Sequence, residues 1–307
     1  MHKVRVGILR GGPSSEYDVS LQTGATILKH IPEDLYTPQD IYISREGVWH
    51  KNGIAISPHN ALAHIDVVWN ALHGQYGEDG KVQHILEFHK IPYTGSNSFS
   101  SMLGMNKILS KEIFKKEKIK TPHYKSITTQ PEEENMRDIF RSFSVPFIVK
   151  PVSAGSSVVV TLVKDFVSFE MALAKAFEHS PSVLIEEYIS GREATVGIID
   201  GYRDHVHYAL PPIEIRPHAE NIIPGNFTLA EKRELEDLAR RVHQVLGLRH
   251  YSRTDFIVSP NRGIFVLEVN TLPGMTESSL MLKALDFVGA PMSHFLDHVL
   301  QLALQKK

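Results

Sequence analysis

The sequence predicts an α/β protein, in which a parallel α/β layer is followed by antiparallel strand pairs with helices. Two observations predict this order. Strand-like and helix-like segments alternate up to about residue 117, and strand-like segments come in pairs from residue 147 onward. A third observation is composition: 42% of the 307 residues are hydrophobic, which is enough to build sizeable cores.

The first third begins with a buried-type strand over residues 4–9. The strand enters a loop rich in helix and strand breakers, residues 10–15, before a helix at about 19–31. Strands at 41–44 and 67–72 then alternate with helices at about 81–90 and 103–117. Such alternation is typical of a parallel sheet covered by helices.

Beyond the polar stretch 128–135, strands are expected in antiparallel pairs: 147–150 with 158–163, then 183–189 with 194–200. A charged amphipathic helix at about 229–246 leads to two more strands, 255–258 and 264–269. Helices from about residues 278 and 292 complete the chain. No internal repeat is present in the sequence.

Composition excludes several classes of protein. The formal net charge is -2 and no run of Lys and Arg is dense, so no nucleic-acid partner is expected. No apolar stretch approaches the roughly 18 residues of a membrane span, and the start lacks a signal-peptide core. The absence of cysteine excludes disulfides and thiolate chemistry. A cytoplasmic protein without a membrane partner is therefore expected.

The segment 146–157 delivers Lys150 from a strand into a small, hydroxyl-rich loop, Val152-Ser153-Ala154-Gly155-Ser156-Ser157. Backbone N–H groups and hydroxyls of such a loop donate to phosphate oxygens, and a partly desolvated lysine adds a positive charge. The alternative is a solvated lysine at a strand end before a flexible hairpin. The residues alone leave both interpretations open.

A second segment places three oxygen-bearing side chains together. Period-two alternation puts Glu268 and Asn270 on one face of a strand, and Asp255 lies on the neighbouring strand. Carboxylate and amide oxygens are ligands that Mg²⁺ shares with nucleotide phosphates. The alternative is a solvent-facing polar strand, which fits less well because the surrounding run is apolar. We therefore expect a magnesium site.

A third segment, residues 183–193, ends a strand in carboxylates and turns through Ser190-Gly191. Its backbone and Glu193 could form the rim of an adenine and ribose pocket. A charged edge strand is the commoner explanation of such a pattern.

Taken together and in this order, these segments resemble the D-alanine–D-alanine ligases of the ATP-grasp superfamily. The resemblance also covers Gly11-Gly12-Pro13-Ser14-Ser15-Glu16, Leu72-His73-Gly74-Gln75-Tyr76-Gly77-Glu78-Asp79-Gly80, Pro92-Tyr93-Thr94-Gly95 and Asn270-Thr271-Leu272-Pro273-Gly274-Met275-Thr276. It implies a three-domain architecture with segments 1–96, 97–183 and 184–307. It also implies a homodimer that forms an acyl phosphate from ATP and one D-alanine, which the amine of a second D-alanine attacks.

The resemblance implies a nucleotide and metal site. Its phosphate-binding residues would be Lys107 and Lys150. Its adenine and ribose contacts would come from Glu186, Glu187, Ile189 and Glu193. Its ligands to Mg²⁺ or Mn²⁺, two ions in the family, would be Asp255, Glu268 and Asn270.

The resemblance also implies a substrate site. Glu16 would bind the ammonium of the first amino acid, with His73 nearby and Ser156 in the supporting hydrogen-bond network. Arg253 and the Gly274 N–H would stabilise the phosphoryl group and the tetrahedral intermediate. Ser279 and Leu280 would receive the carboxylate of the second amino acid. These roles suit the chemistry, because carboxylate activation and aminolysis both need positive charge or N–H donors at developing oxyanions.

One region departs from the family pattern. The loop over the active site, residues 215–227, is short and has neither tyrosine nor lysine. Relatives that select D-lactate have a histidine in this loop, and His218 could act similarly, although a surface histidine is the commoner case among the 17 histidines of the chain. The alternatives for function are thus an ATP-grasp ligase with a D-lactate, D-serine or other acceptor, and a nucleotide-binding regulator without turnover.

One further pattern is His294 and His298, which lie four residues apart on a helix. This spacing suits metal ligands, but no glutamate of the zinc-protease motifs accompanies it. We expect a solvated helix face.

Overall fold

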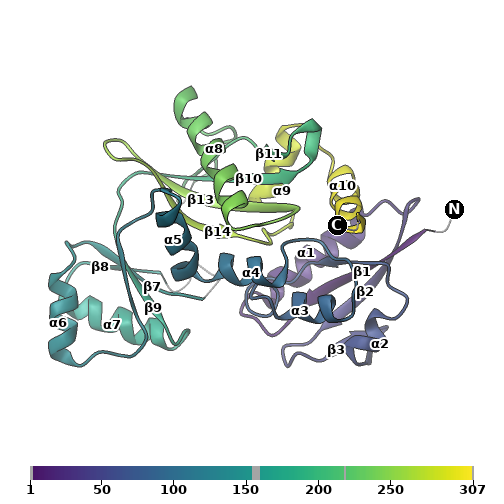
Figure 1. Ribbon diagram of the computed structural model, residues 1–307, viewed down its shortest axis with the longest axis horizontal. Helices are drawn as coiled ribbons and strands as arrows, with labels where there is room; N and C mark the ends of the chain where they lie inside the picture. The colour runs from purple at the N-terminus through teal and green to yellow at the C-terminus, as the bar shows by residue number, and fades with distance from the viewer. Residues whose placement is uncertain (1–2, 154–159, 218, 306–307) are drawn as a thin grey trace.

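A computed structural model describes residues 3–153, 160–217 and 219–305. Within these residues the chain forms three sheets, each covered by its own helices (Figure 1). In Figure 1 the N-terminal sheet lies at the right, the central sheet at the left, and the C-terminal sheet above them. The predicted α/β class with an antiparallel later part is confirmed.

The N-terminal sheet has the strand order β4-β3-β2-β1-β5. Three of its strands are parallel, as the alternating pattern predicted: β1 (Val4–Gly11), β2 (Tyr36–Ile43) and β5 (Val67–Asn70). Its helices are α1 (Tyr17–His30), α2 (Pro58–Leu62) and α3 (Lys81–Phe88). An antiparallel hairpin of β3 (Trp49–Lys51) and β4 (Ile54–Ala55) was not predicted, since both strands are very short.

The central sheet is antiparallel throughout, in the order β6-β9-β7-β8. Its strands are β6 (Tyr124–Ile127), β7 (Phe147–Pro151), β8 (Thr161–Val163) and β9 (Val183–Glu187). Two helices, α6 (Glu133–Arg141) and α7 (Phe166–Phe177), bury an aromatic cluster against it. The rings of Phe140, Phe147 and Phe169 pack edge-on or tilted within 5.9 Å of each other.

The C-terminal sheet has the order β11-β10-β13-β14, and β12 also pairs with β10. Its strands are β10 (Arg192–Asp200), β11 (His207–Ala209), β12 (Ile213–Ile215), β13 (Tyr251–Ser259) and β14 (Gly263–Asn270). A short 3-10 turn, Tyr202–Asp204, joins β10 to β11. Helix α8 (Leu229–Val245) buries its apolar face against the sheet. Helices α9 (Leu280–Phe287) and α10 (Met292–Leu304) share a core with the N-terminal sheet.

The predicted pairing of 183–189 with 194–200 is wrong. Strand β9 belongs to the central sheet and β10 to the C-terminal sheet, so the chain crosses between sheets at Ser190 and Gly191. Gly191 passes close to β13: a Cβ atom there would lie 2.4 Å from the Val258 carbonyl oxygen. A local alternation of apolar residues predicts strands but does not specify their partners.

The structure also corrects two predictions about helices. The helix predicted at 103–117 is two helices, α4 (Ser98–Met105) and α5 (Lys107–Lys116). Asn106 separates them, and its side-chain oxygen accepts hydrogen bonds from the N–H groups of Ile108 and Leu109 at the start of α5. On α10, His294 is exposed as predicted, but His298 is partly buried and bonds the Asp200 carbonyl oxygen.

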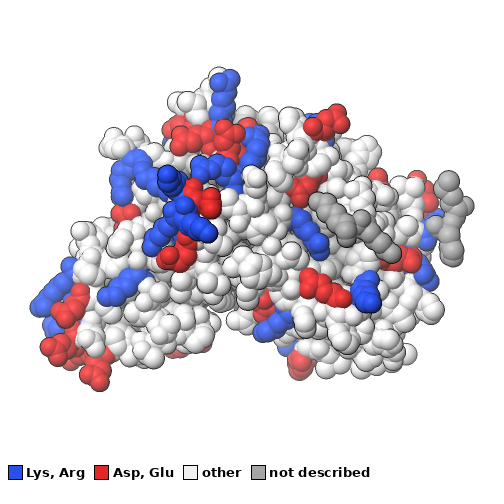
Figure 2. Space-filling view, viewed as in Figure 1, with Lys and Arg blue, Asp and Glu red and all other residues white. Residues whose placement is uncertain are grey.

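No helix among the described residues is long and apolar enough to cross a membrane. On the face drawn in Figure 2, Lys and Arg side chains are interspersed with Asp and Glu. The segment boundaries at residues 96 and 183 stay predictions.

Candidate active site between the two antiparallel sheets

A cavity of about 470 Å³ lies between the central and C-terminal sheets. The central sheet contributes residues of β7 and β9, and the C-terminal sheet contributes residues of β10, β13 and β14. Eight of the residues predicted for the nucleotide, metal and phosphoryl sites line it: Lys150, Glu186, Glu187, Ile189, Glu193, Arg253, Asp255 and Glu268. The cavity is large enough for a nucleotide-sized ligand.

Two lysines share one carboxylate at the floor of this cavity. Glu186 Oε1 lies 2.6 Å from Lys111 Nζ, and Glu186 Oε2 lies 2.6 Å from Lys150 Nζ. All three side chains are buried, so a solvated lysine at position 150 is excluded. Burial lowers the pKa of Lys111 to about 8, although Glu186 opposes that shift. The group carries one positive charge in excess when both lysines are protonated, which favours an anion in the cavity.

Lys111 was not predicted from the sequence. It lies one turn after Lys107 on α5, a helix with four lysines and one glutamate in ten residues, which is typical of a solvated helix. The four-residue spacing places Lys107 and Lys111 on one helix face, but Lys115 follows by the same spacing, so only packing in the fold distinguishes the two buried lysines from the exposed Lys115.

The residues after β9 form one wall of the cavity. The Glu187 carboxylate bonds Arg262 at 3.0 and 3.2 Å, which leaves its backbone as the part that faces a ligand. Ile189 packs with Ile257 and Phe265. Burial raises the pKa of Glu193, and the nearby Asp255 carboxylate raises it further. The alternative of a charged edge strand is wrong, because β9 lies between β6 and β7.

Two carboxylates face each other across β13 and β14, where Asp255 and Glu268 are register partners. Asp255 is held by Arg253, whose Nε and Nη2 each lie 3.1 Å from one of its oxygens, and by Thr195 at 2.5 Å. Burial would raise the pKa of Glu268, but Lys107 and Lys150 lower it to about 2. Glu268 is therefore ionised at neutral pH, and the pair presents two anionic groups to one point of the cavity.

Lys107 and Asn270 flank this pair. Lys107 Nζ lies 3.3 Å from Glu268 Oε2. The Asn270 side-chain oxygen accepts a hydrogen bond from the Leu272 N–H at 3.1 Å, which orients it at the end of β14. A cavity of about 40 Å³ adjoins both residues and Glu78. The three predicted metal ligands thus lie at one place, on the adjacent strands β13 and β14.

Glu16 and His73 come from the N-terminal part of the chain. The loop after β1 holds Glu16 against Gly74, where a Cβ atom would approach the Glu16 Oε2 to 2.6 Å. Burial raises the pKa of Glu16, Lys107 and Arg253 lower it, and Glu268 raises it. These charges put the predicted ammonium-binding residue within electrostatic reach of the phosphate site.

His73 is buried, and its Nε2 lies 2.8 Å from Thr23 Oγ1. Burial lowers the pKa of His73 to about 4, so the ring is neutral at physiological pH. A neutral ring that bonds Thr23 and the Leu272 backbone serves to position the loop between β5 and α3. His73 therefore lies near Glu16 as predicted, without adding charge to it.

Glu78 is a functional candidate that sequence reasoning missed. Its two oxygens accept hydrogen bonds from the N–H groups of Gly74, at 2.8 Å, and Leu272, at 3.0 Å. It thereby ties the loop beside Glu16 to the loop after Asn270. Burial raises the pKa of Glu78 to about 7, and Glu16 adds to the shift. A glutamate between Gly77 and Asp79 is typical of an exposed turn, so the local sequence did not predict that Glu78 is buried.

The remaining predicted residues lie around α9. Gly274 is close to Ser279: a Cβ atom at 274 would meet the Ser279 Oγ at 3.3 Å. That Oγ accepts a hydrogen bond from the Thr276 N–H at 2.9 Å, and α9 begins at Leu280. Ser156 lies outside the described residues, so its role stays a prediction.

Of the predicted lid segment, the structure describes residues 215–217 and 219–227, which are held by hydrogen bonds to Glu214. Glu214 and Ile222 exchange two backbone hydrogen bonds of 3.0 and 3.1 Å, and the Glu214 carboxylate accepts one from the Asn226 N–H at 2.9 Å. Ile215 lines the cavity. His218 lies outside the described residues, so its proposed role is untested.

Comparison with known proteins agrees with this geometry. Residues 113–301 match the family model described as D-ala D-ala ligase C-terminus, and residues 5–62 and 50–96 match the one described as D-ala D-ala ligase N-terminus. A D-alanine--D-alanine ligase from Geotalea uraniireducens is 34% identical over 98% of this chain and 96% of its own length.

Solved structures show the same fold. A D-alanine--D-alanine ligase from Bacillus anthracis complexed with ATP has a TM-score of 0.83, with 34% identity over 98% of both chains. The VanG D-Ala:D-Ser ligase from Enterococcus faecalis has a TM-score of 0.85 and 25% identity, and the match covers 98% of this chain and all of that one. The chain therefore belongs to the D-alanine–D-alanine ligase family of ATP-dependent ligases.

Proposed function

We propose that this protein joins two D-alanines to D-alanyl-D-alanine for peptidoglycan synthesis, through an acyl phosphate formed with ATP. The observation that carries the proposal is the continuity of one site. Lys150 at the floor of the cavity acts on Glu268 of the carboxylate pair, Glu268 pairs with Lys107, and Lys107 acts on the partly buried Glu16. Such an order suits transfer of a phosphoryl group to an amino acid.

The cavity accounts for the nucleotide. Ile189, Ile257 and Leu267 offer apolar surface to an adenine ring, and the backbone after Glu187 offers donors and acceptors to its edge. Glu193, which lines the same cavity, would accept a ribose hydroxyl. Lys150, with the excess charge of the lysine pair, would hold phosphate oxygens.

The residues fit a magnesium site, and Mn²⁺ would suit the same oxygen ligands. Carboxylates that are direct cross-strand partners repel each other, and a cation between Asp255 and Glu268 would remove that repulsion. Asn270 would supply a third, neutral oxygen. Bound Mg²⁺, two ions in the family, would neutralise charge on the phosphates during transfer. Arg253 holds Asp255 in place for this role.

Each step of the reaction would then depend on different residues of the chain. Glu16 would pair with the ammonium of the first D-alanine and so orient its carboxylate toward the phosphate. Lys107 and Arg253 would face the oxygens that gain negative charge, and the Gly274 N–H would donate to the oxyanion of the tetrahedral intermediate. The N-terminus of α9, at Ser279 and Leu280, would receive the carboxylate of the second D-alanine.

The setting of the protein is part of the same proposal. ATP and amino acids are cytoplasmic substrates, and the absence of cysteine suits a reducing compartment. We expect a homodimer, as the resemblance to the family implies. We expect no nucleic-acid or membrane partner.

A coupled assay tests the function. Purified protein with ATP and Mg²⁺ should release phosphate and form dipeptide with D-alanine, and should do neither with L-alanine. D-Serine and D-lactate as acceptors, each with D-alanine as the first substrate, distinguish the related ligases. Preferential joining of D-lactate or D-serine would replace the proposed acceptor. ATP binding without turnover on any of these substrates would identify a regulator instead.

A further inference from the structure

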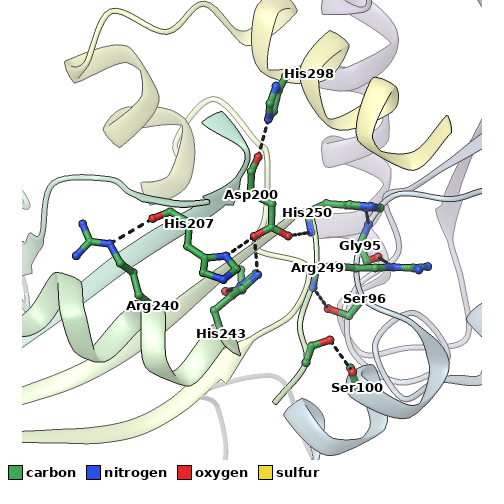
Figure 3. A network of polar contacts seen from close by, with 12 residues as sticks. Gly95, Ser96, Ser100, Asp200, His207, Arg240, His243, Arg249, His250 and His298 are labelled. Atoms are coloured by element: carbon green, nitrogen blue, oxygen red, sulfur yellow. Dashed lines mark hydrogen bonds and ion pairs between the residues drawn. The ribbon is translucent and has the colours of Figure 1, made fainter. Parts of the chain in front are cut away.

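A cluster of histidines surrounds Asp200, at the end of β10 away from the nucleotide cavity (Figure 3). Thr195, which contacts Asp255 of the predicted magnesium site, lies five residues earlier on the same strand. At about 3.3 Å per residue the two places are ~17 Å apart. The cluster is therefore separate from the active site.

Three ligand-type atoms converge in this cluster. Asp200 Oδ1 lies 2.8 Å from His207 Nδ1 and 3.0 Å from His243 Nε2. These three atoms all lie within 4.8 Å of one another. They come from three elements, since Asp200 ends β10, His207 begins β11 and His243 belongs to α8, as Figure 3 shows.

His243 carries the observation that points to a ligand. Its side chain is fully buried, and its Nδ1 bonds the Ser252 hydroxyl oxygen at 2.7 Å. Its Nε2 lies 3.0 Å from Asp200 Oδ1 but makes no hydrogen bond with the described residues. A buried, unsatisfied nitrogen in a native protein needs an explanation, and a bound ion is one.

The surroundings suit a cation. The His250 N–H donates to Asp200 Oδ2 at 2.7 Å, which leaves Oδ1 to face the two rings. Arg240, beside His207, is paired with Asp237 at 2.6 Å and Glu236 at 3.4 Å, so its charge is already compensated.

We propose that Asp200, His207 and His243 bind one Zn²⁺ ion, with a fourth position open to water. Two imidazoles and a carboxylate suit zinc, whereas Mg²⁺ prefers oxygen alone. Donors around tetrahedral zinc are about 3.3 Å apart, so the two N–O distances need to open by only about 0.3 to 0.5 Å. The Asp200 and His207 side chains are 20% and 26% exposed, which gives the ion a way in.

Hydrogen bonds between the three ligand residues and their neighbours support this assignment. The Ser252 hydroxyl can fix the His243 tautomer that keeps Nε2 free of a proton. Arg240 Nε donates to the His207 carbonyl oxygen at 3.2 Å and holds the start of β11. Zinc at this position would tie the β10–β11 hairpin to α8 and stabilise the folded chain.

Zinc titration of the full-length, metal-stripped protein tests the proposal, with Mg²⁺ in excess to occupy oxygen-rich sites. Calorimetry should find one zinc per chain, and zinc should raise the midpoint of thermal unfolding. His207→Asn should weaken zinc binding by about 100-fold or more. His243→Gln should do the same. His294→Gln removes an exposed histidine and is the matched control, which should bind zinc like the wild type.

If the buried His243→Gln variant fails to fold, the variant at the partly exposed His207 still tests the proposal. Visible absorption of Co²⁺ in place of Zn²⁺ would report nitrogen ligands, and the band should be lost in His207→Asn. Equal zinc affinity in the wild type and in His207→Asn would overturn the proposal. Absence of zinc binding to the wild type at micromolar concentration would overturn it as well.

Discussion

The buried triad of Lys111, Glu186 and Lys150 gives the sharpest test of the electrostatics. Glu186→Gln keeps the volume of the side chain and removes its charge, so two buried ammonium groups lose the carboxylate that each contacts at 2.6 Å. The exposed fractions of the three side chains are 0%, 3% and 8%, so water replaces little of the lost interaction. The variant should therefore be strongly destabilised.

The size of the loss follows from the geometry. Removing one partner of a buried ion pair costs about 3–5 kcal/mol, because it leaves an uncompensated charge. Deprotonation limits the loss here: the pKa of Lys111 is already about 8 with Glu186 in place and falls further without it, so at pH 7 the variant can neutralise that lysine for about 1 kcal/mol or less. We expect a loss near 3 kcal/mol, or about 6 °C in the thermal midpoint for a chain of this size.

Thermal unfolding followed by circular dichroism, without nucleotide, measures the loss. Glu187→Gln is the matched control, since it is the neighbouring glutamate but its pair with Arg262 is exposed by 28% and 49%. An exposed pair contributes about 0–1 kcal/mol, so this variant should unfold within about 2 °C of the wild type. Equal midpoints for Glu186→Gln and Glu187→Gln would refute the reasoning.

Four further predictions concern the site and its loops. Glu268→Gln should reduce ligation at least 100-fold, an estimate of about 3 kcal/mol for a lost charged metal ligand, while circular dichroism stays unchanged. Glu16→Gln should raise the KM for the first D-alanine and leave ATP affinity unchanged, because its ion pair is local to that substrate. Glu78 has a folded-state pKa raised to about 7, so the stability it contributes is complete below about pH 4.5 and is lost as pH rises through 7. Between pH 5 and 8 the wild type should lose up to about 3 kcal/mol of unfolding free energy that Glu78→Gln, which cannot titrate, does not lose. The short lid at 215–227 should let water reach the acyl phosphate, so phosphate release should exceed dipeptide formation when the acceptor is scarce, and His218→Ala should increase the excess if that histidine closes the site.

Each of these has a contrary result. Wild-type turnover in Glu268→Gln would remove it from the metal site, and an equal loss of ATP affinity in Glu16→Gln would assign Glu16 to the nucleotide. Parallel pH profiles for the wild type and Glu78→Gln would show that Glu78 is ionised throughout. Strict one-to-one stoichiometry, unchanged by His218→Ala, would mean that the lid is sealed by other contacts.

Patterns of local sequence were sufficient for the strands that carry the chemistry. Glu268 and Asn270 stand two residues apart at the end of the apolar run that begins at Phe265, and the period of two in a strand puts them on one face. Lys150 was found because it stands between a buried strand and a breaker-rich loop. Both signals are local, so no knowledge of distant contacts was needed.

The predictions that failed depend on contacts between residues that are far apart in the sequence. Strands 183–187 and 192–200 adjoin in sequence yet lie in different sheets, because Gly191 lets the chain pass β13 at a distance that no side chain allows. Glu78 and Lys111 look like surface charges, and only the packing of the loop 271–272 and of β9 buries them. A single sequence carries no signal of such burial.

The facing carboxylates of β13 and β14 also bear on how this protein would evolve under selection for stability. Asp255 and Glu268 are direct register partners, and in the ligand-free protein each is paired with its own cation, Arg253 and Lys107 respectively. A screen that rewarded heat resistance alone should therefore retain both carboxylates, because a neutral residue at either position leaves a largely buried cation without its partner. Persistence of both charges in an inactive but heat-resistant variant would show that the fold, as well as turnover, constrains these two positions.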